Sequence, residues 1–220
     1  KEYSRQRQMC IRDSGFAIGV MIVSLFAYFA ARFIPQTPRA APDLVVDVNI
    51  FRSTFRLLRL LYANAELWRL TRVTSLFWLF GSIAMSLLPP LVTHRLNGAD
   101  SVVTLHLAIF AVAIAIGSGL AAFLLKGRIV LLPAAVGAAL IAGAAGDLGV
   151  ALLLHPMQAS QGALAADAYF AQPLALRAAI DLGLMALAGG LMIVPAFAAI
   201  QAQSPVAERA RIVAAVNVHN

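Results

Sequence analysis

The stretch "VVTLHLAIFAVAIAIGSGLAAFLL" (Val102–Leu125) runs for 24 residues without an Asp, Glu, Lys or Arg. A helix needs about 20 predominantly apolar residues to cross a hydrocarbon core about 30 Å thick. The length and composition of this stretch therefore predict a transmembrane helix.

Four further apolar runs have a similar length, at 15–34, 73–94, 129–155 and 174–201. Of the 220 residues, 61% are hydrophobic and 12% are charged, and the mean hydropathy is +0.83. A soluble domain needs more polar surface than this composition supplies. No alternating pattern recurs as a membrane barrel would require, so helices are expected to satisfy the backbone. The sequence predicts an all-α, multi-pass transmembrane helix bundle with five spans.

The charge balance is basic, with a formal net charge of +7. The cations stand at the ends of apolar runs rather than on one polar face, which favours membrane topology over nucleic-acid binding. Cys10 is the only cysteine, so disulfide frameworks and Cys-based metal sites are excluded. The histidines are scattered, and no Gly-rich phosphate loop or HxxxxD acyltransferase pair occurs. We predict no catalytic, cofactor or metal site in this segment, and no nucleic-acid partner.

The orientation follows from the Arg-rich stretch at 49–72, because Lys and Arg favour the cytoplasmic side. This stretch carries Arg52, Arg56, Arg59, Arg69 and Arg72. If it is cytoplasmic, alternation also places the basic residues at 126–128 and 209–211 inside. The loop 156–173, which has no Lys or Arg, then lies outside.

The first 14 residues, "KEYSRQRQMCIRDS", disagree with this orientation because they put cations outside. "MCIRDS" is what a common sequencing adapter yields when it is translated. We interpret residues 1–14 as a non-native, adapter-derived segment and leave them out of functional arguments. The alternative is a genuine basic extension. Since the last residues begin like a loop leading into another helix, we expect a fragment of a larger protein that cannot transport by itself.

The Arg-rich stretch also has a helical pattern, because Arg52, Arg56 and Arg59 recur at i, i+4 and i+7. Asp47 or Asn49 is positioned to cap the helix, after a Pro-rich segment. We predict a cytoplasmic linker over 35–72 with an amphipathic helix at the membrane surface. Its arginines are expected to face anionic lipid and its leucines the acyl boundary. The alternatives are a tether between helix bundles, or recognition of a lipid substrate or partner enzyme.

Four ionisable residues interrupt the apolar runs: His106, Asp147, Arg177 and Asp181. A charge at the centre of a bilayer costs at least about 2.5 kcal/mol, so these residues are pathway candidates. Asp181 is expected roughly 10 Å inside the outer end of its helix, and Asp147 close to the outer interface. Arg177 precedes Asp181 by four residues on the same face, which allows the two to pair. The alternatives are a structural ion pair and, for Asp147 and His106, an interfacial position.

Small and aromatic residues are also patterned. Gly117 with Gly119, and the pair Gly189 and Gly190, permit close contact between helices. The run "LFWLF" at 76–80 predicts an aromatic wall or an interfacial belt.

Three stretches together resemble the major facilitator superfamily, and within it the lysophospholipid transporter branch. This branch includes the transporter domain fused to acyltransferase and acyl-carrier-protein synthetase modules. "SLFWLFGSIAMSLLPPLV" resembles the seventh helix, and "VVTLHLAIFAVAIAIGSGLAAFLLKGRI" the eighth helix with its basic loop. "GGLMIVPAFAAIQAQSPVAERARIVAAVNVHN" resembles the tenth helix and the following loop. The resemblance implies helices six to ten of twelve, with the end of the N-terminal bundle at 15–34 and a partial C-terminal bundle at 73–220.

The implied function is movement of lysophospholipid, typically lysophosphatidylethanolamine, across the bacterial inner membrane for reacylation. The implied partners are membrane phospholipid or lysophospholipid and a fused or associated acyltransferase. From depth and chemistry we choose Arg177, Asp181, Phe77, Trp78 and Asp147 as residues of the substrate pathway. The competing interpretations are a drug or small-solute exporter of the same superfamily, and a membrane anchor domain of a fused acyltransferase.

Overall fold

The computed structural model describes residues 2–35, 49–155 and 162–220, and of residues 2–16 only the course of the backbone. The residues that the structure describes are predominantly helical and contain no strand. The all-helical prediction is therefore confirmed. Two units are present, Lys1–Pro42 and Asp43–Asn220.

The first unit consists of α1 (Glu2–Arg32), on which the expected span 15–34 lies. The part of this helix whose side chains are described, Ala17–Arg32, is apolar. Arg32 donates a hydrogen bond of 3.1 Å to the Tyr28 hydroxyl one turn earlier. The Pro-rich segment of the expected linker and Asp47, the alternative cap of the amphipathic helix, lie outside the described residues.

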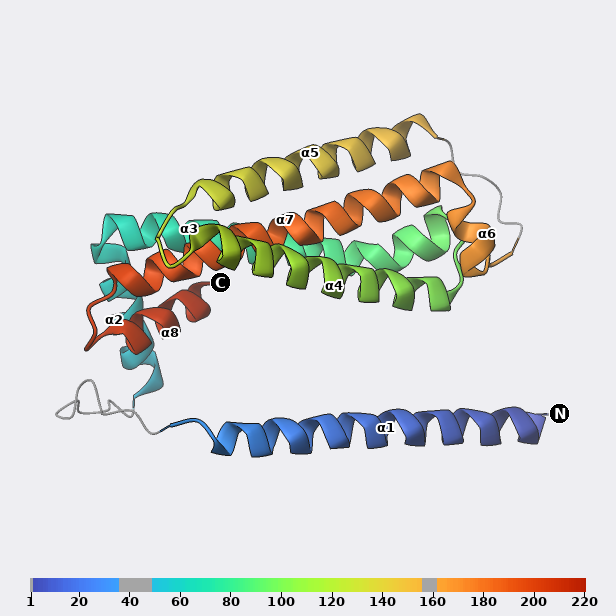
Figure 1. Cartoon of the computed structure of the whole chain (residues 1–220), viewed down its shortest axis with the longest axis horizontal. Helices are drawn as coiled ribbons and strands as arrows, with labels where there is room; N and C mark the ends of the chain where they lie inside the picture. The colour runs from blue at the N-terminus through green and yellow to red at the C-terminus, as the bar shows by residue number, and fades with distance from the viewer. Residues whose placement is uncertain (1, 36–48, 156–161) are drawn as a thin grey trace. The chain divides into compact units, whose positions relative to one another are not determined.

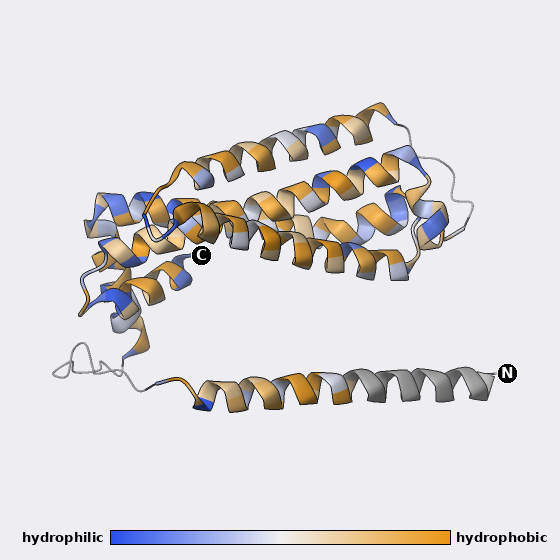
Figure 2. Ribbon diagram, viewed as in Figure 1, coloured by the Kyte–Doolittle hydropathy of each residue, from blue (hydrophilic) through white to orange (hydrophobic). Residues whose placement is uncertain are grey.

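Four helices in the second unit are long and apolar enough to cross a membrane, which indicates a membrane protein. They are α3 (Ala65–Pro90), α4 (Asp100–Leu125), α5 (Leu132–Leu154) and α7 (Pro173–Gln203). After two prolines, α3 continues into a π-helical turn, η1 (Leu91–Arg95). These helices coincide with four of the five predicted spans, although α3 begins earlier than the run 73–94. Hydrophobic residues cover most of their length (Figure 2).

Helix α7 is the centre of the bundle and packs against α4, α5 and α3 (Figure 1). Small residues allow its backbone to approach that of its neighbours. A Cβ on Gly117 of α4 would lie 1.9 Å from the Leu187 carbonyl oxygen on α7. A Cβ on Gly190 of α7 would lie 2.5 Å from the Ile114 carbonyl oxygen on α4. These helices therefore touch through glycine, as the small residues in the sequence suggested.

One end of the bundle, which we call the Arg95 end, joins η1, the start of α4, the end of α5 and the start of α7. A short parallel bridge pairs Gly98 with Leu164, and the amide of Ala99 donates to the Leu164 carbonyl over 2.9 Å. The short helix α6 (Ala166–Phe170) follows this bridge. Arg95 donates to the carbonyls of Leu152 and His155, so it caps the last turn of α5.

The opposite end, which we call the α2–α8 end, contains α2 (Ile50–Ala63) and α8 (Arg209–His219). The predicted cap is confirmed, because Asn49 Oδ1 accepts the Arg52 amide over 3.0 Å. Leu57, Leu60 and Leu61 pack in a core with α3, α7 and α8. The expectation that the leucines of this helix face the acyl boundary is wrong for these three, because they pack against residues of neighbouring helices.

Candidate functional site

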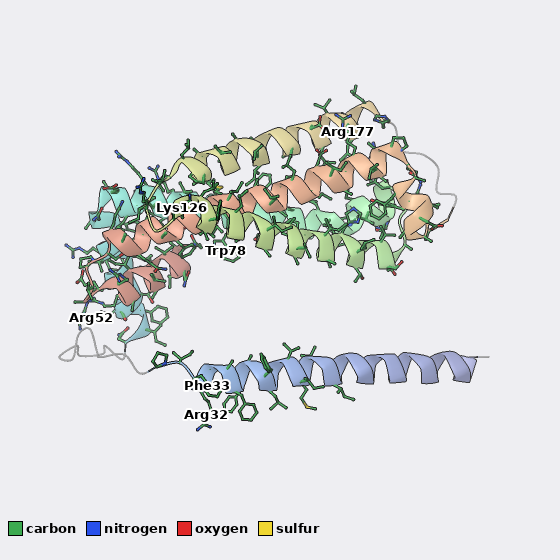
Figure 3. All side chains as sticks on the ribbon, in the orientation of Figure 1. Arg32, Phe33, Arg52, Trp78, Lys126 and Arg177 are labelled. Carbon is green, nitrogen blue, oxygen red and sulfur yellow. The ribbon has the colours of Figure 1, made fainter. Side chains whose placement is uncertain are left out.

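An apolar cavity, which we call the Trp78 cavity, lies between α3, α4, α5 and α7 and has a volume of about 300 Å³. Phe77 and Trp78 line it from α3, and their rings meet edge to face with centroids 5.5 Å apart. Gly189 of α7 makes room for Phe77, since a Cβ there would lie 3.0 Å from the Phe77 ring. The aromatic wall of the sequence thus borders a cavity (Figure 3 labels Trp78).

A second apolar cavity, which we call the Arg95 groove, lies between α3, α5 and α7 and has a volume of about 400 Å³. It shares Phe80, Ala84 and Met185 with the Trp78 cavity. Because these residues border both cavities, the two form one elongated apolar surface along α3. Arg95 is the only charged residue among the described residues that line the groove.

A charged cluster connects α5 with α7. Arg177 Nε donates to Asp147 Oδ2 over 2.8 Å, and Arg177 Nη2 donates to Asp147 Oδ1 (Figure 3 labels Arg177). The pairing of Arg177 with Asp181 that the sequence suggested is replaced by this bidentate pair. The sequence contained a signal for this pair. At 1.5 Å per residue, Asp147 lies about 11 Å before the end of α5 and Arg177 about 6 Å after the start of α7, so the two residues have a similar depth in the bundle.

Asp181 lies in the interior of the bundle, where its side chain is only 7% exposed. Its Oδ2 atom has no hydrogen-bond partner among the described residues. Asp147 and Arg177 are the charged groups with which it interacts. A buried carboxylate oxygen without a partner is costly, and in membrane proteins such groups belong to pathways and binding sites more often than to inert cores.

The structure separates the residues that we predicted to share a pathway. On α5, Ala145 and Gly149 line the Arg95 groove. Asp147 lies two residues from each of them, which is about 200° of helical rotation, so it is on the opposite face of α5. Met185, one turn after Asp181 on α7, reaches both cavities. Phe77 and Trp78 border the Trp78 cavity, whereas Asp147, with which Arg177 of α7 pairs, lies on another face of α5.

His106 belongs to an aromatic group at the Arg95 end. It is 2% exposed, its Nδ1 lies 2.9 Å from the Val102 carbonyl oxygen, and its ring stacks on Phe170 with centroids 5.7 Å apart. Tyr169 packs edge to face against both rings, and burial raises the pKa of its hydroxyl. The ring of His106 is therefore packed between aromatic side chains at this end of the bundle. We did not single out Tyr169, and its only sequence signal is the pair Tyr169–Phe170 in a polar loop.

Arg52, Arg56 and Arg59 are exposed along one face of α2, as their spacing predicted (Figure 3 labels Arg52). Beside them, Phe51 and Phe55 are 89% and 72% exposed. Aromatic side chains next to arginines are typical of a helix that lies at a membrane surface.

The arrangement of these groups can bind an apolar ligand that carries a charged group. Among the described residues, no group of three or more His, Cys, Asp and Glu side chains is placed to hold a metal ion. The Trp78 cavity and the Arg95 groove form an elongated apolar surface, with charged groups nearer to one of its ends.

No family model matches the chain, and no curated protein and no solved structure matches it either.

Proposed function

We propose that this chain forms part of a major facilitator superfamily transporter that moves lysophospholipid, with lysophosphatidylethanolamine as the expected substrate. The observation that carries the proposal is the Trp78 cavity together with the Arg95 groove, since the two share lining residues and run along α3. Ligand pockets are mostly apolar with a few polar groups that fix orientation. An elongated apolar surface of this kind fits one acyl chain.

The charged cluster supports a substrate with a polar head. Asp181 has a buried oxygen without a partner, one helical turn from Met185 in the cavity wall. The ammonium group of an ethanolamine head is a cation that this carboxylate attracts. Phe77 and Trp78 contact the acyl chain in this proposal, and Arg177 with Asp147 holds α7 against α5 beside it.

The basic helix α2 supports the proposed membrane and orientation. Its arginines stand beside exposed aromatic rings, and each Arg near an anionic lipid surface contributes about 1 kcal/mol of attraction. We place this face at the cytoplasmic surface of a bacterial inner membrane. There, a fused or associated acyltransferase reacylates the delivered lysophospholipid.

The proposal is tested by the transbilayer movement of fluorescent lysophosphatidylethanolamine in proteoliposomes that contain the complete transporter. We expect faster movement than in empty vesicles, and slower movement in the variant Asp181→Asn, because it loses the buried charge. The matched control is Asp167→Asn on α6, which should leave the rate unchanged.

A folded protein that does not accelerate the lipid would contradict the proposal. A drug or small-solute exporter is the second candidate, and one observation favours it: no charged residue borders the Trp78 cavity among the described residues. Transport of a hydrophobic dye without transport of the lipid would support that candidate. Transport of neither would support a membrane anchor domain.

A further inference from the structure

Arg95 is a half-buried cation that the proposed function has not used. Its Nη2 donates to the last carbonyls of α5. Among the described residues it makes no ion pair with a carboxylate, because the two ion pairs found there belong to other arginines. Arg177 differs, since both Asp147 oxygens already accept its hydrogen bonds. Of these two arginines, Arg95 is the one whose charge no carboxylate neutralises.

The position of Arg95 joins apolar and polar surroundings. It closes the Arg95 groove at one end and also lines a small recess of about 230 Å³ on its other side. Polar groups from three segments line this recess: Asn97, His155 and Gln172. Along α3 and η1, the groove runs from Phe80 to Arg95, roughly 22 Å at 1.5 Å per residue. A cation therefore stands where an apolar groove meets a polar mouth.

We propose that Arg95 binds the phosphate of a lysophospholipid whose acyl chain lies in the Arg95 groove and reaches the Trp78 cavity. This inference rests on the proposed function and names the part of the site that recognises the headgroup. The amide and imidazole groups of the recess beside Arg95 donate further hydrogen bonds to the phosphate. A guanidinium without a carboxylate partner complements a phosphate diester, which is the anionic group of such a lipid.

Quenching of tryptophan fluorescence by bromine on the acyl chain can report how the lipid is oriented. The polypeptide contains only two tryptophans, so a single-tryptophan variant needs one substitution. The substitution Trp68→Phe leaves Trp78 as the only tryptophan of the 220 residues. Lysophosphatidylethanolamine brominated near the end of its acyl chain should quench Trp78 more strongly than the same lipid brominated near the ester. The reverse order would overturn the proposal, since it places the headgroup at the Trp78 cavity.

Affinity tests the role of the charge. In the same background, Arg95→Gln keeps amide donors for the α5 carbonyls but removes the charge, and should weaken lysophosphatidylethanolamine binding about tenfold. Arg95→Lys should retain most of the affinity. The matched control Arg128→Gln, at the other end of the bundle, should bind as the parent does. Equal affinities for Arg95→Gln and Arg128→Gln would contradict the proposal.

A neutral lipid separates headgroup recognition from acyl-chain binding without any substitution at Arg95. Brominated monoacylglycerol with the same chain should bind the parent protein about tenfold more weakly than the lysophospholipid, and should not respond to Arg95→Gln. Quenching by both lipids with equal affinity would overturn the role of Arg95 alone. Absence of quenching by either lipid would instead overturn the acyl-chain site on which the proposed function rests.

Discussion

Helices α4 and α7 have similar composition but opposite surroundings. The most apolar window of α4 has a mean hydropathy of 2.4, and only 11% of it is buried. The corresponding window of α7 has a lower mean hydropathy, 2.1, yet 61% of it is buried. Hydropathy therefore identifies both helices as possible spans but gives the wrong order for their burial.

Residue size explains the difference better than hydropathy does. Nine of the sixteen buried residues of α7 are alanine or glycine. Lipid tails are as apolar as leucine, so a large apolar side chain gains little by leaving lipid for the bundle interior. Small side chains gain close packing between backbones instead. The small residues of α7 that face α4 and α5 therefore allow this helix to lie at the centre of the bundle, although α5 contains a larger share of alanine and glycine than α7 does.

The largest expected effect comes from adding one methyl group at the contact between these two helices. Gly117→Ala places a Cβ 1.9 Å from the Leu187 carbonyl oxygen, so α4 and α7 must separate. We expect the free energy of unfolding in mixed micelles to fall by about 1 to 3 kcal/mol. The matched control is Gly119→Ala on the same helix, which meets no atom within 4 Å and should stabilise by up to about 1 kcal/mol. Equal effects of the two changes would refute the glycine contact.

A smaller effect is expected at the helix ends, where α3 and α7 differ. Asn64 Oδ1 accepts the amides of Glu66 and Leu67 at 3.0 and 3.1 Å at the start of α3. Asn64→Ala should therefore cost about 1 kcal/mol in the same unfolding measurement. The N-cap residue of α7, Gln172, makes no such bond, and Gln172→Ala should change stability by less than about 0.5 kcal/mol. If Gln172→Ala costs as much as Asn64→Ala, side-chain capping does not distinguish the two helices.

The sequence predicted correctly those features that depend on a single helix, such as its extent and its cap. The run 102–125 became α4 almost residue for residue, and Asn49 caps α2, because hydropathy and capping are local properties. The partner of Arg177 was missed: a similar depth on two helices allowed the pair with Asp147, but the spacing of residues does not show which helices face each other. The inward leucines of α2, such as Leu61, were misplaced for the same reason: an amphipathic helix fits a bilayer surface and a protein core equally well.

The buried hydroxyl of Tyr169 should have a smaller effect. It has no hydrogen-bond partner among the described residues, so Tyr169→Phe removes an uncompensated polar group and should leave stability unchanged or raise it by up to about 1 kcal/mol. Burial raises the pKa of this phenol in the folded state, so above the unfolded value near 10 only the unfolded chain ionises there. The parent should lose stability as the pH rises above about 10, and Tyr169→Phe should lose less. Parallel stability curves for the two proteins would contradict this.

The smallest change in stability is expected at the one buried charge on the small-residue surface of α7. Asp181→Leu replaces a carboxylate that has an unpartnered oxygen, and that interacts with Asp147, by an apolar side chain with the same branching. Such replacements are often neutral or stabilising, so unfolding in mixed micelles should show no loss of stability. Lipid movement should nevertheless fall, since the proposed contact with the ammonium group disappears. A variant that is less stable but still transports would mean that Asp181 holds α7 in place. A variant that is fully stable but inactive would mean that α7 retains this charge for the substrate, at a position where its packing alone favours an apolar residue.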